Sequence, residues 1–560
     1  MKTGSQTRST KKMLRKYPAL GLMIAAGALA VLLPSALTVP QSGPSTLAEF
    51  APVPGSGQGS SDLSDVGQAS SGGLGFGSGS GASRSGIGDE IGAPKQGKAK
   101  LKRCVGSPPR QTEDLLSPPC VAFFDGDNGG ATSKGVTKDE VSVVLFATAR
   151  TGDDATFVDC FDGPAATDRP DDVICKAYAR FFNNRFQTYN RVVHIWLFHP
   201  ATGASGVVID AEVGRANDQK RPFAINTASA QSEFFIARAA ATRQIVGVQY
   251  SATSRFNYTK FAPYIIGFRM DLEDRAATAA SYICTKLARR VARFSGTEGD
   301  RLKPRKFGYI AAANSPYRAA LDAELKEACD LVISSSSNPT SPTNAQVEMA
   351  KLKADEVTTV IVANEWSQNA AAGATANAWF PEWFIPGFSE PNAADTNSEA
   401  RGHRPPQWNS AFGLTLDYRR DEVPNQPWYR AYKEGCPVCP EPSDAAAAFV
   451  YDSFNMLFWG LQAAGPRLTP ESLDKGLHAI PARGSPDPYK PAAYFAPGNY
   501  SFIKDAMEIW WDSQGQAPGD PALGCYRLPN GGRRFRAGEW LPGDDDIQKV
   551  GVPCQGSTRL

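Results

Sequence analysis

The sequence has few of the residues that metal sites and acid–base catalysis use most often. Among 560 residues there are four histidines, His194, His199, His403 and His478, and no two have the spacing of a metal-binding helical pair. The motifs G-x-S-x-G, Walker A and H-E-x-x-H are absent as well, which excludes three common catalytic or nucleotide-binding sites. We therefore expect no catalytic group, no metal site and no other cofactor.

The chain also lacks an excess of charge of either sign. It has 59 Lys and Arg residues and 57 Asp and Glu residues, so the net charge is +2. A nucleic-acid-binding protein usually carries a strongly basic face, and we expect no nucleic acid as a partner. The balance hides a basic N-terminus, because six Lys and Arg residues lie in the first sixteen positions.

Residues 18–39 form the one long apolar segment without a charge. As a helix, its 22 residues would extend about 33 Å, enough to cross a hydrocarbon core of about 30 Å. With the basic segment 1–17 on the cytoplasmic side, this pattern predicts a single-pass membrane anchor. A cleaved secretory signal is the alternative, and the protein would then be secreted. Either way we expect the rest of the chain to be extracytoplasmic.

Residues 40–103 are dominated by Gly, Ser and other small residues. Such a segment buries too little apolar area to offset the entropy lost on ordering, so we predict a disordered tether. A flexible chain of this length would hold the folded part roughly 40 to 45 Å from the bilayer.

The ten cysteines are an even set, as expected for a protein in an oxidising compartment. Cys436 and Cys439 form a C-x-x-C motif, which could be a redox motif or half of a zinc site, although a structural disulfide is our main interpretation. Pairing of sequence neighbours gives the predicted disulfides Cys104–Cys120, Cys160–Cys175, Cys284–Cys329, Cys436–Cys439 and Cys525–Cys554.

Short apolar, β-branched runs alternate with amphipathic helical patterns in two successive series. This alternation is typical of parallel sheets covered by helices on both faces, so we predict two α/β lobes. The predicted strands are 141–147, 192–198, 223–226, 245–250, 307–311, 331–333, 357–363, 383–385 and 506–511. The predicted helices are 172–186, 205–217, 231–243, 271–294, 317–329, 345–354 and 444–464.

The run from Asp127 to Thr137, which leads into Asp139 and the apolar strand after it, resembles the entry of actinobacterial solute-binding proteins of the type I periplasmic fold. These are the branched-chain amino acid and amide binding proteins of ATP-driven importers, and the resemblance extends over about residues 125–525. It implies two α/β lobes, joined by three crossings, that close on a small molecule. It assigns 104–268 and 418–490 to lobe 1, and 269–417 and 491–560 to lobe 2.

The resemblance places ligand-binding residues after two strands of the first lobe. Ser229 and Ser232 lie where the family holds a ligand carboxylate at a strand-to-helix turn, and a helix N-terminus suits an anion. An ordinary Ser N-cap is the alternative. Tyr250 and Thr253 lie in the next strand-end loop, where Thr253 would face the same ligand, unless this loop is simply polar.

Three further positions come from the second lobe by the same resemblance. Tyr317 would cover the bound solute, or else pack in its own lobe's core. Trp366 would form a wall of the ligand pocket, or serve as core packing. Glu390 would accept a hydrogen bond from a ligand ammonium, or be a surface residue.

The sequence departs from the family at Phe234 and Phe235 and at Arg255, where smaller or neutral residues are more usual, so specificity for amino acids is open. The first hypothesis is a solute-binding protein that serves an ABC permease or a sensor. The second is a cell-surface interaction protein on the same scaffold, which a filled cleft would favour. The third is an enzyme acting on envelope polymers, which a carboxylate pair in an empty cleft would favour.

Overall fold

The computed structural model describes residues 104–148, 155–201, 206–229, 233–311, 315–362, 367–387, 406–442, 446–482 and 488–556. All of them belong to one compact unit, Ala48–Leu560. The predicted anchor and tether lie outside these ranges. Within them, no helix combines the length and the hydropathy needed to cross a bilayer.

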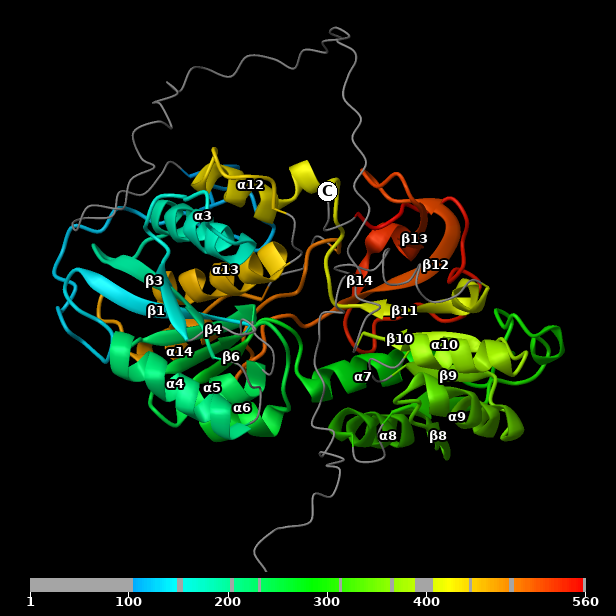
Figure 1. Cartoon of the computed structure of the whole chain (residues 1–560). Helices are drawn as coiled ribbons and strands as arrows, with labels where there is room; N and C mark the ends of the chain where they lie inside the picture. Colours follow the sequence, from blue (N-terminus) through cyan, green and yellow to red (C-terminus); the bar gives the residue numbers. More distant parts are fainter. Residues whose placement is uncertain are drawn as a thin grey trace, which may run out of the picture. The chain divides into compact units, whose positions relative to one another are not determined.

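The first sheet has six strands in the order β2-β3-β1-β4-β5-β6. Figure 1 labels β3, β1, β4 and β6 of this sheet. Every strand pair is parallel except the edge pair, where β2 runs antiparallel to β3. Strand β1 is central, and its residues from Val141 onward are buried, as expected for a parallel strand with both faces covered. The strands are β1 (Glu140–Ala147), β2 (Thr156–Asp159), β3 (Val192–His199), β4 (Ala224–Ser229), β5 (Val246–Gln249) and β6 (Ile265–Gly267). The helices between them are α3 (Pro170–Arg185), α4 (Gly206–Lys220), α5 (Glu233–Ala241) and α6 (Arg255–Phe261).

The second sheet runs β13-β12-β11-β10-β9-β7-β8, with β14 paired to β12. Its strands up to β11 are parallel, whereas β12 pairs antiparallel with β11, β13 and β14. The strands are β7 (Phe307–Ile310), β8 (Ser335–Ser337), β9 (Thr359–Val362), β10 (Glu382–Pro386), β11 (Ala411–Thr415), β12 (Ala506–Gln516), β13 (Leu523–Arg527) and β14 (Arg534–Phe535). The helices are α7 (Leu272–Tyr282), α8 (Pro316–Cys329), α9 (Pro342–Ala354) and α10 (Ser367–Ala376).

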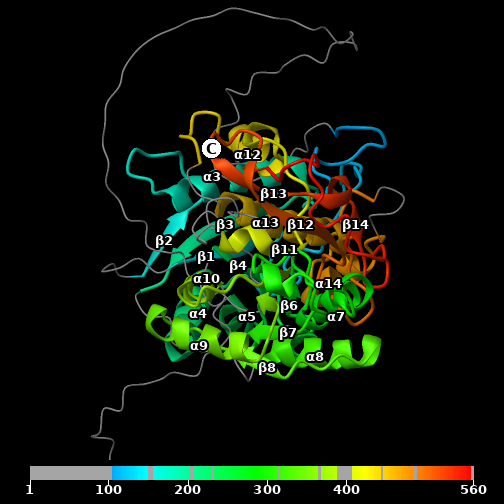
Figure 2. The same ribbon diagram turned by 90° about the vertical axis from the view of Figure 1, so that its right-hand side faces the viewer.

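Three helices that follow β11 in sequence return to the first sheet: α12 (Pro427–Gly435), α13 (Ala446–Ala464) and α14 (Pro470–His478). Figures 1 and 2 both show α12 and α13 beside α3. The ring of Phe182 stacks on that of Phe458 with centroids 5.0 Å apart. Helix α12 approaches α3 so closely that a Cβ on Gly435 would lie 2.0 Å from the Ala177 carbonyl oxygen. The chain therefore passes between the two sheets three times. We call these segments, near residues 268–271, 416–426 and 503–505, the first, second and third crossings.

All five predicted disulfides are confirmed. Cys436 caps the C-terminus of α12, where the helix dipole disfavours a thiolate, so the position does not suit a redox-active cysteine. Within the described ranges, no group of three or more metal-ligating side chains is close enough to hold a metal ion.

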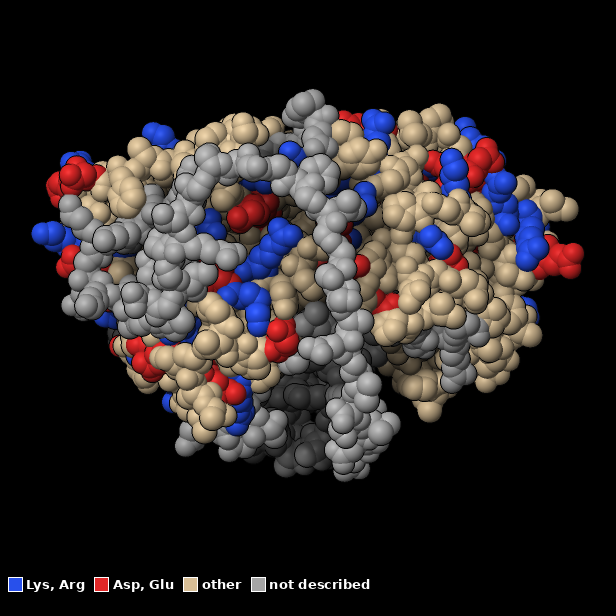
Figure 3. Space-filling model, turned by 90° about the horizontal axis from the view of Figure 1, so that it is seen from above, with Lys and Arg blue, Asp and Glu red and all other residues tan. Residues whose placement is uncertain are grey.

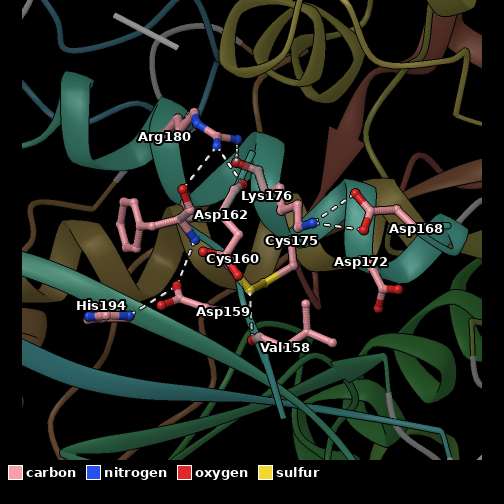
Figure 4. The surroundings of a disulfide bond; sticks show 12 residues. Val158, Asp159, Cys160, Asp162, Asp168, Asp172, Cys175, Lys176, Arg180 and His194 are labelled. Atoms are coloured by element: carbon pink, nitrogen blue, oxygen red, sulfur yellow. Dashed lines mark hydrogen bonds and ion pairs between the residues drawn. A yellow bond between two sulfur atoms is a disulfide. The ribbon is translucent and has the colours of Figure 1, made fainter. Parts of the chain in front are cut away.

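The Cys160–Cys175 disulfide joins the end of β2 to α3 and is flanked by charged groups (Figure 4). Lys176 forms an ion pair with Asp168 at 2.8 Å. On the strand side, His194 Nε2 lies 3.1 Å from Asp159, and its Nδ1 lies 3.6 Å from Glu140. On the face seen in Figure 3, basic and acidic side chains are interspersed, in keeping with the small net charge.

Most predicted strands and helices are confirmed, but the strand predicted at 331–333 is wrong. Asp330 ends α8 in the left-handed conformation (φ 54°), and the Leu331 amide then bonds back to the Leu325 carbonyl. The apolar run thus follows the C-terminus of α8, a position where helices often have a hydrophobic residue. It does not form a buried strand, because Val332 is 71% exposed. The actual strand, β8, consists of three serines.

Two further expectations need correction. The helix predicted from 271 to 294 ends as an α-helix at Tyr282 and continues only as a π-helical turn from Ile283 to Leu287. The sheets are also not purely parallel, because β2 and β12 to β14 run antiparallel at their edges.

Candidate functional site

The structure describes only some of the seven predicted ligand-binding residues. Ser232, Trp366 and Glu390 lie outside the described residues. Ser229 is the last residue of β4, and of it only the backbone is described. The site is therefore built from Tyr250, Thr253 and Tyr317 and the groups around them.

Tyr250 follows the end of β5 and belongs to the region where the chain passes between the sheets. Its ring stacks on Phe268 with centroids 5.5 Å apart and also contacts Phe449 at 4.7 Å. Its hydroxyl oxygen accepts a hydrogen bond from Arg269 at 2.8 Å. Burial raises the pKa of Tyr250 well above its ordinary value, although Arg269 acts to lower it. With 6% of its surface exposed, Tyr250 presents little more than an edge to any ligand.

Thr253 ties the same loop to the start of α7. Its hydroxyl accepts a hydrogen bond from Asn257 Nδ2 at 2.8 Å, and its carbonyl accepts one from the Leu272 amide at 3.2 Å. Only 2% of Thr253 is exposed. The predicted loop residues Tyr250 and Thr253 thus lie together, beside the first crossing.

Glu233, which was not among the predicted site residues, fixes this loop through hydrogen bonds to its backbone. It is the first residue of α5, and its carboxylate accepts hydrogen bonds from the amides of Tyr250 (2.7 Å) and Ser251 (2.9 Å). A carboxylate on paired backbone amides is the geometry expected for a ligand carboxylate. The protein's own side chain fills these two donors, so a ligand carboxylate has to use others. An acidic residue in a first helical turn directly after a strand was the available signal in the sequence.

A buried network of ion pairs and hydrogen bonds connects the three crossings. Asp417, in the second crossing, forms ion pairs with Arg269 of the first crossing and with Arg420, the latter at 2.6 Å. Arg534 donates to the Asp417 carbonyl and forms an ion pair with Asp505 of the third crossing at 2.7 Å. Burial raises the pKa of the Asp417 carboxyl, but the three nearby guanidinium groups lower it by more, so it lies below its ordinary value. Asp417 is therefore a charged anchor for all three crossings.

Asp452, on α13, borders this network and has the opposite protonation tendency. Burial, followed by the charges of Asp114 and Asp417, raises the pKa of Asp452 well above its ordinary value. The Tyr418 hydroxyl donates a hydrogen bond to the Asp452 carboxyl at 3.3 Å. A carboxylate held charged, Asp417, therefore lies near a carboxyl that favours the neutral form, Asp452.

Tyr317, at the start of α8, lies in the hydrophobic core of the second sheet. Its side chain is fully buried, and this burial raises its pKa well above the ordinary value, although the charge of Arg275 acts to lower it. This is the placement that core packing predicts, and a role in covering a ligand stays a prediction.

No family model matches the sequence, and no curated protein matches it. Solved structures that resemble it include a solute-binding protein of an ABC transporter from R. palustris in complex with 4-hydroxybenzoate, at 10% identity and a TM-score of 0.48, covering 72% of this chain and 99% of that one. A leucine-, isoleucine-, valine-, threonine- and alanine-binding protein from Brucella ovis has 11% identity and a TM-score of 0.48, covering 74% of this chain and 100% of that one. An ABC transporter substrate-binding protein from Desulfitobacterium hafniense in complex with Leu has 11% identity and a TM-score of 0.44, covering 70% and 100%.

Proposed function

We propose that this chain is a membrane-tethered, extracytoplasmic solute-binding protein that closes two lobes on a small polar molecule. It would deliver the solute to an ABC permease or report it to a sensor, without catalysing a reaction. The observation that carries the proposal is the pair of α/β sheets joined by three crossings that share one buried ionic network. Open α/β sheets bind ligands beyond the carboxyl ends of their strands, and the loop of Tyr250 and Thr253 lies at such an end.

The lobes that we propose differ slightly from those the resemblance implied. Phe495 and Phe502 pack in the hydrophobic core of the first sheet, so we extend lobe 1 to about residue 503. Lobe 2 then comprises about residues 269–417 and 504–560. Ligand binding would favour the closed arrangement by contacting both lobes at once, while the buried network keeps the crossings as a fixed pivot.

For the ligand itself, we propose an amino acid, an amide or a molecule of similar size and polarity. Because Glu233 fills the amides of Tyr250 and Ser251, a ligand carboxylate would be held by Ser229, Ser232 and the hydroxyl of Thr253. Tyr317, Trp366 and Glu390 would supply the contacts from lobe 2.

The second candidate function is a surface interaction protein that keeps the scaffold but binds no small molecule. One observation favours it: the described ligand-site candidates Tyr250, Thr253 and Tyr317 are all buried.

Calorimetric and thermal unfolding titrations of the full-length chain in detergent separate these candidates. The panel would contain amino acids, amides, short peptides, polyamines and sugars. A true solute at 100 times its dissociation constant should add about 2.7 kcal/mol to the free energy of unfolding. Thr253→Val should weaken that solute about tenfold, the loss of one hydrogen bond to a charged group. The control Thr259→Val alters an exposed hydroxyl on α6 and should leave affinity unchanged. A folded protein that responds to no member of the panel would favour the interaction protein.

The anchor needs its own test. Mass spectrometry of the protein from the membrane fraction should find the peptide spanning residues 18–39 if the segment is retained. A mature N-terminus beyond residue 39 would establish the cleaved signal instead.

A further inference from the structure

A cavity of about 390 Å³, lined in part by charged side chains, lies beside the third crossing, and the proposed solute site does not account for it. Its walls come from the first residue of α6, from α7, from the segment 494–504 and from residues 536 and 537, just after β14. Three cationic side chains, Arg255, Lys504 and Arg536, line it, whereas the only carboxylate in the lining is Asp274.

The cationic wall is held in place by hydrogen bonds within the protein. Lys504 is 7% exposed at its side chain, and its ammonium donates to Asn499 Oδ1 and Ser501 Oγ, both at 2.8 Å. It also lies 3.3 Å from Asp274. A long side chain that is fixed in this way has already lost its rotamer entropy before any ligand arrives.

Arg255 forms ion pairs with two carboxylates but remains partly exposed at the cavity. Its guanidinium forms ion pairs with Asp274 and, at 3.2 Å, with the fully buried Asp271. Its backbone amide donates to Glu273 at 2.8 Å. Even so, 43% of the Arg255 side chain is exposed. Arg255, one of the positions where the sequence departs from the family, is thus a positive group with a fixed orientation at the cavity.

Arg536 also lines the cavity. Its guanidinium carbon lies 6.0 Å from the centroid of the Tyr494 ring, a cation–π distance. The lining contains three positive groups and one carboxylate, while the carboxylates of Asp271 and Glu273, which contact Arg255, lie outside it. Burial lowers the pKa of Lys504, although the charges of Asp274 and Asp271 act to raise it.

We propose that this cavity is a second ligand site, which binds a small oxyanion, a phosphate or a carboxylate, between Arg255 and Arg536. Guanidinium groups donate parallel hydrogen bonds to the two oxygens of such anions, and Lys504 adds a point charge. Because α6 belongs to the first sheet and Arg536 follows β14 of the second, a bound anion would contact both lobes.

Isothermal titration calorimetry of the full-length chain in detergent tests the site, with potassium phosphate in one arm and sodium succinate in the other. We expect saturable binding of one equivalent in at least one arm. Arg536→Gln should weaken that binding about tenfold or more, because it removes charge-assisted hydrogen bonds. The matched control is Arg533→Gln, since Arg533 is an exposed arginine in the same segment that does not line the cavity. It should change the affinity less than twofold.

Binding of phosphate alone or of succinate alone would support the site and name its ligand class. No saturable heat in either arm, with the protein folded, would overturn the proposal. An equal loss in Arg536→Gln and Arg533→Gln, or no loss in either, would overturn it too, because the anion would then bind by general surface charge or elsewhere. Solute binding is measured separately with Thr253→Val, so failure here leaves the proposed function standing, and the reverse also holds.

Discussion

Replacing Asp417 by Asn tests whether the buried network holds the crossings together. The substitution keeps the size of the side chain and removes its charge. Arg269 and Arg420, whose side chains are 7% and 6% exposed, then remain in the protein interior without their shared counter-ion. Removing one partner of a buried ion pair typically costs about 3–5 kcal/mol. Because Asn retains one carbonyl acceptor, we expect a loss near 3 kcal/mol in the free energy of unfolding.

The loss should also depend on pH with a defined sign. The pKa of Asp417 is lower in the folded protein than the ordinary value, so its charge stabilises the folded state above the unfolded pKa of about 3.9. That contribution disappears as the pH falls through the folded pKa. The difference in unfolding free energy between the natural protein and Asp417→Asn should therefore be full at pH 7 and smaller below about pH 4.

Urea unfolding, followed by tryptophan fluorescence with the disulfides intact, measures this difference. Asp421→Asn is the matched control, because Asp421 lies four residues further along the same crossing and is exposed. It should change the free energy of unfolding by less than about 0.5 kcal/mol. A loss below about 1 kcal/mol for Asp417→Asn at pH 7, or a loss as large for Asp421→Asn, would refute the role assigned to the network.

Two other predictions concern the first lobe. Burial lowers the pKa of His194, but hydrogen bonds and charges from its two carboxylate neighbours raise it by more. The charge of His194 therefore stabilises the folded state below about pH 6.5, and this stabilisation is lost as the pH rises through the folded pKa. His194→Gln should therefore cost about 0.5–1 kcal/mol at pH 5.5 and less at pH 8.5 in urea unfolding, and an equal cost at both would contradict the assignment. Replacing Cys160 and Cys175 together by Ala opens a loop with a sequence separation of 15 and should cost about 3 kcal/mol, whereas the same change at Cys436 and Cys439, with a separation of 3, should cost less. A reversed order in calorimetric unfolding would be evidence against loop closure as the source of the stabilisation.

Much of the fold could be predicted from the sequence because parallel strands covered on both faces are continuous apolar runs. Strands β1, β3 and β9 follow this rule and are confirmed. Strand β8 violates it, since three serines at a sheet edge have no pattern that distinguishes them from a loop. The five disulfides were predictable because each cysteine pairs with its neighbour in sequence.

Less of the candidate site could be predicted. Arg269 and Asp417 are 148 residues apart, and one sequence carries no signal that brings a particular arginine to a particular carboxylate over such a separation. The burial of Thr253 also depends on α7, which belongs to the second series of elements. Local pattern indicated which loop follows β5, but tertiary contacts decide whether its side chains face solvent.

The return of α12, α13 and α14 to the first sheet has a consequence for the biogenesis of the protein. The core of that sheet contains residues from Leu116 to Ile503, so no early part of the chain can complete it alone. In the export that we propose, the segments after the anchor emerge in sequence order, and the aromatic face of α3, including Phe182, would emerge long before Phe458 can cover it. Exposed apolar surface of this kind promotes aggregation and binds chaperones during synthesis. If the chain is exported as proposed, we expect export to be coupled to chaperone protection until the last crossing has emerged.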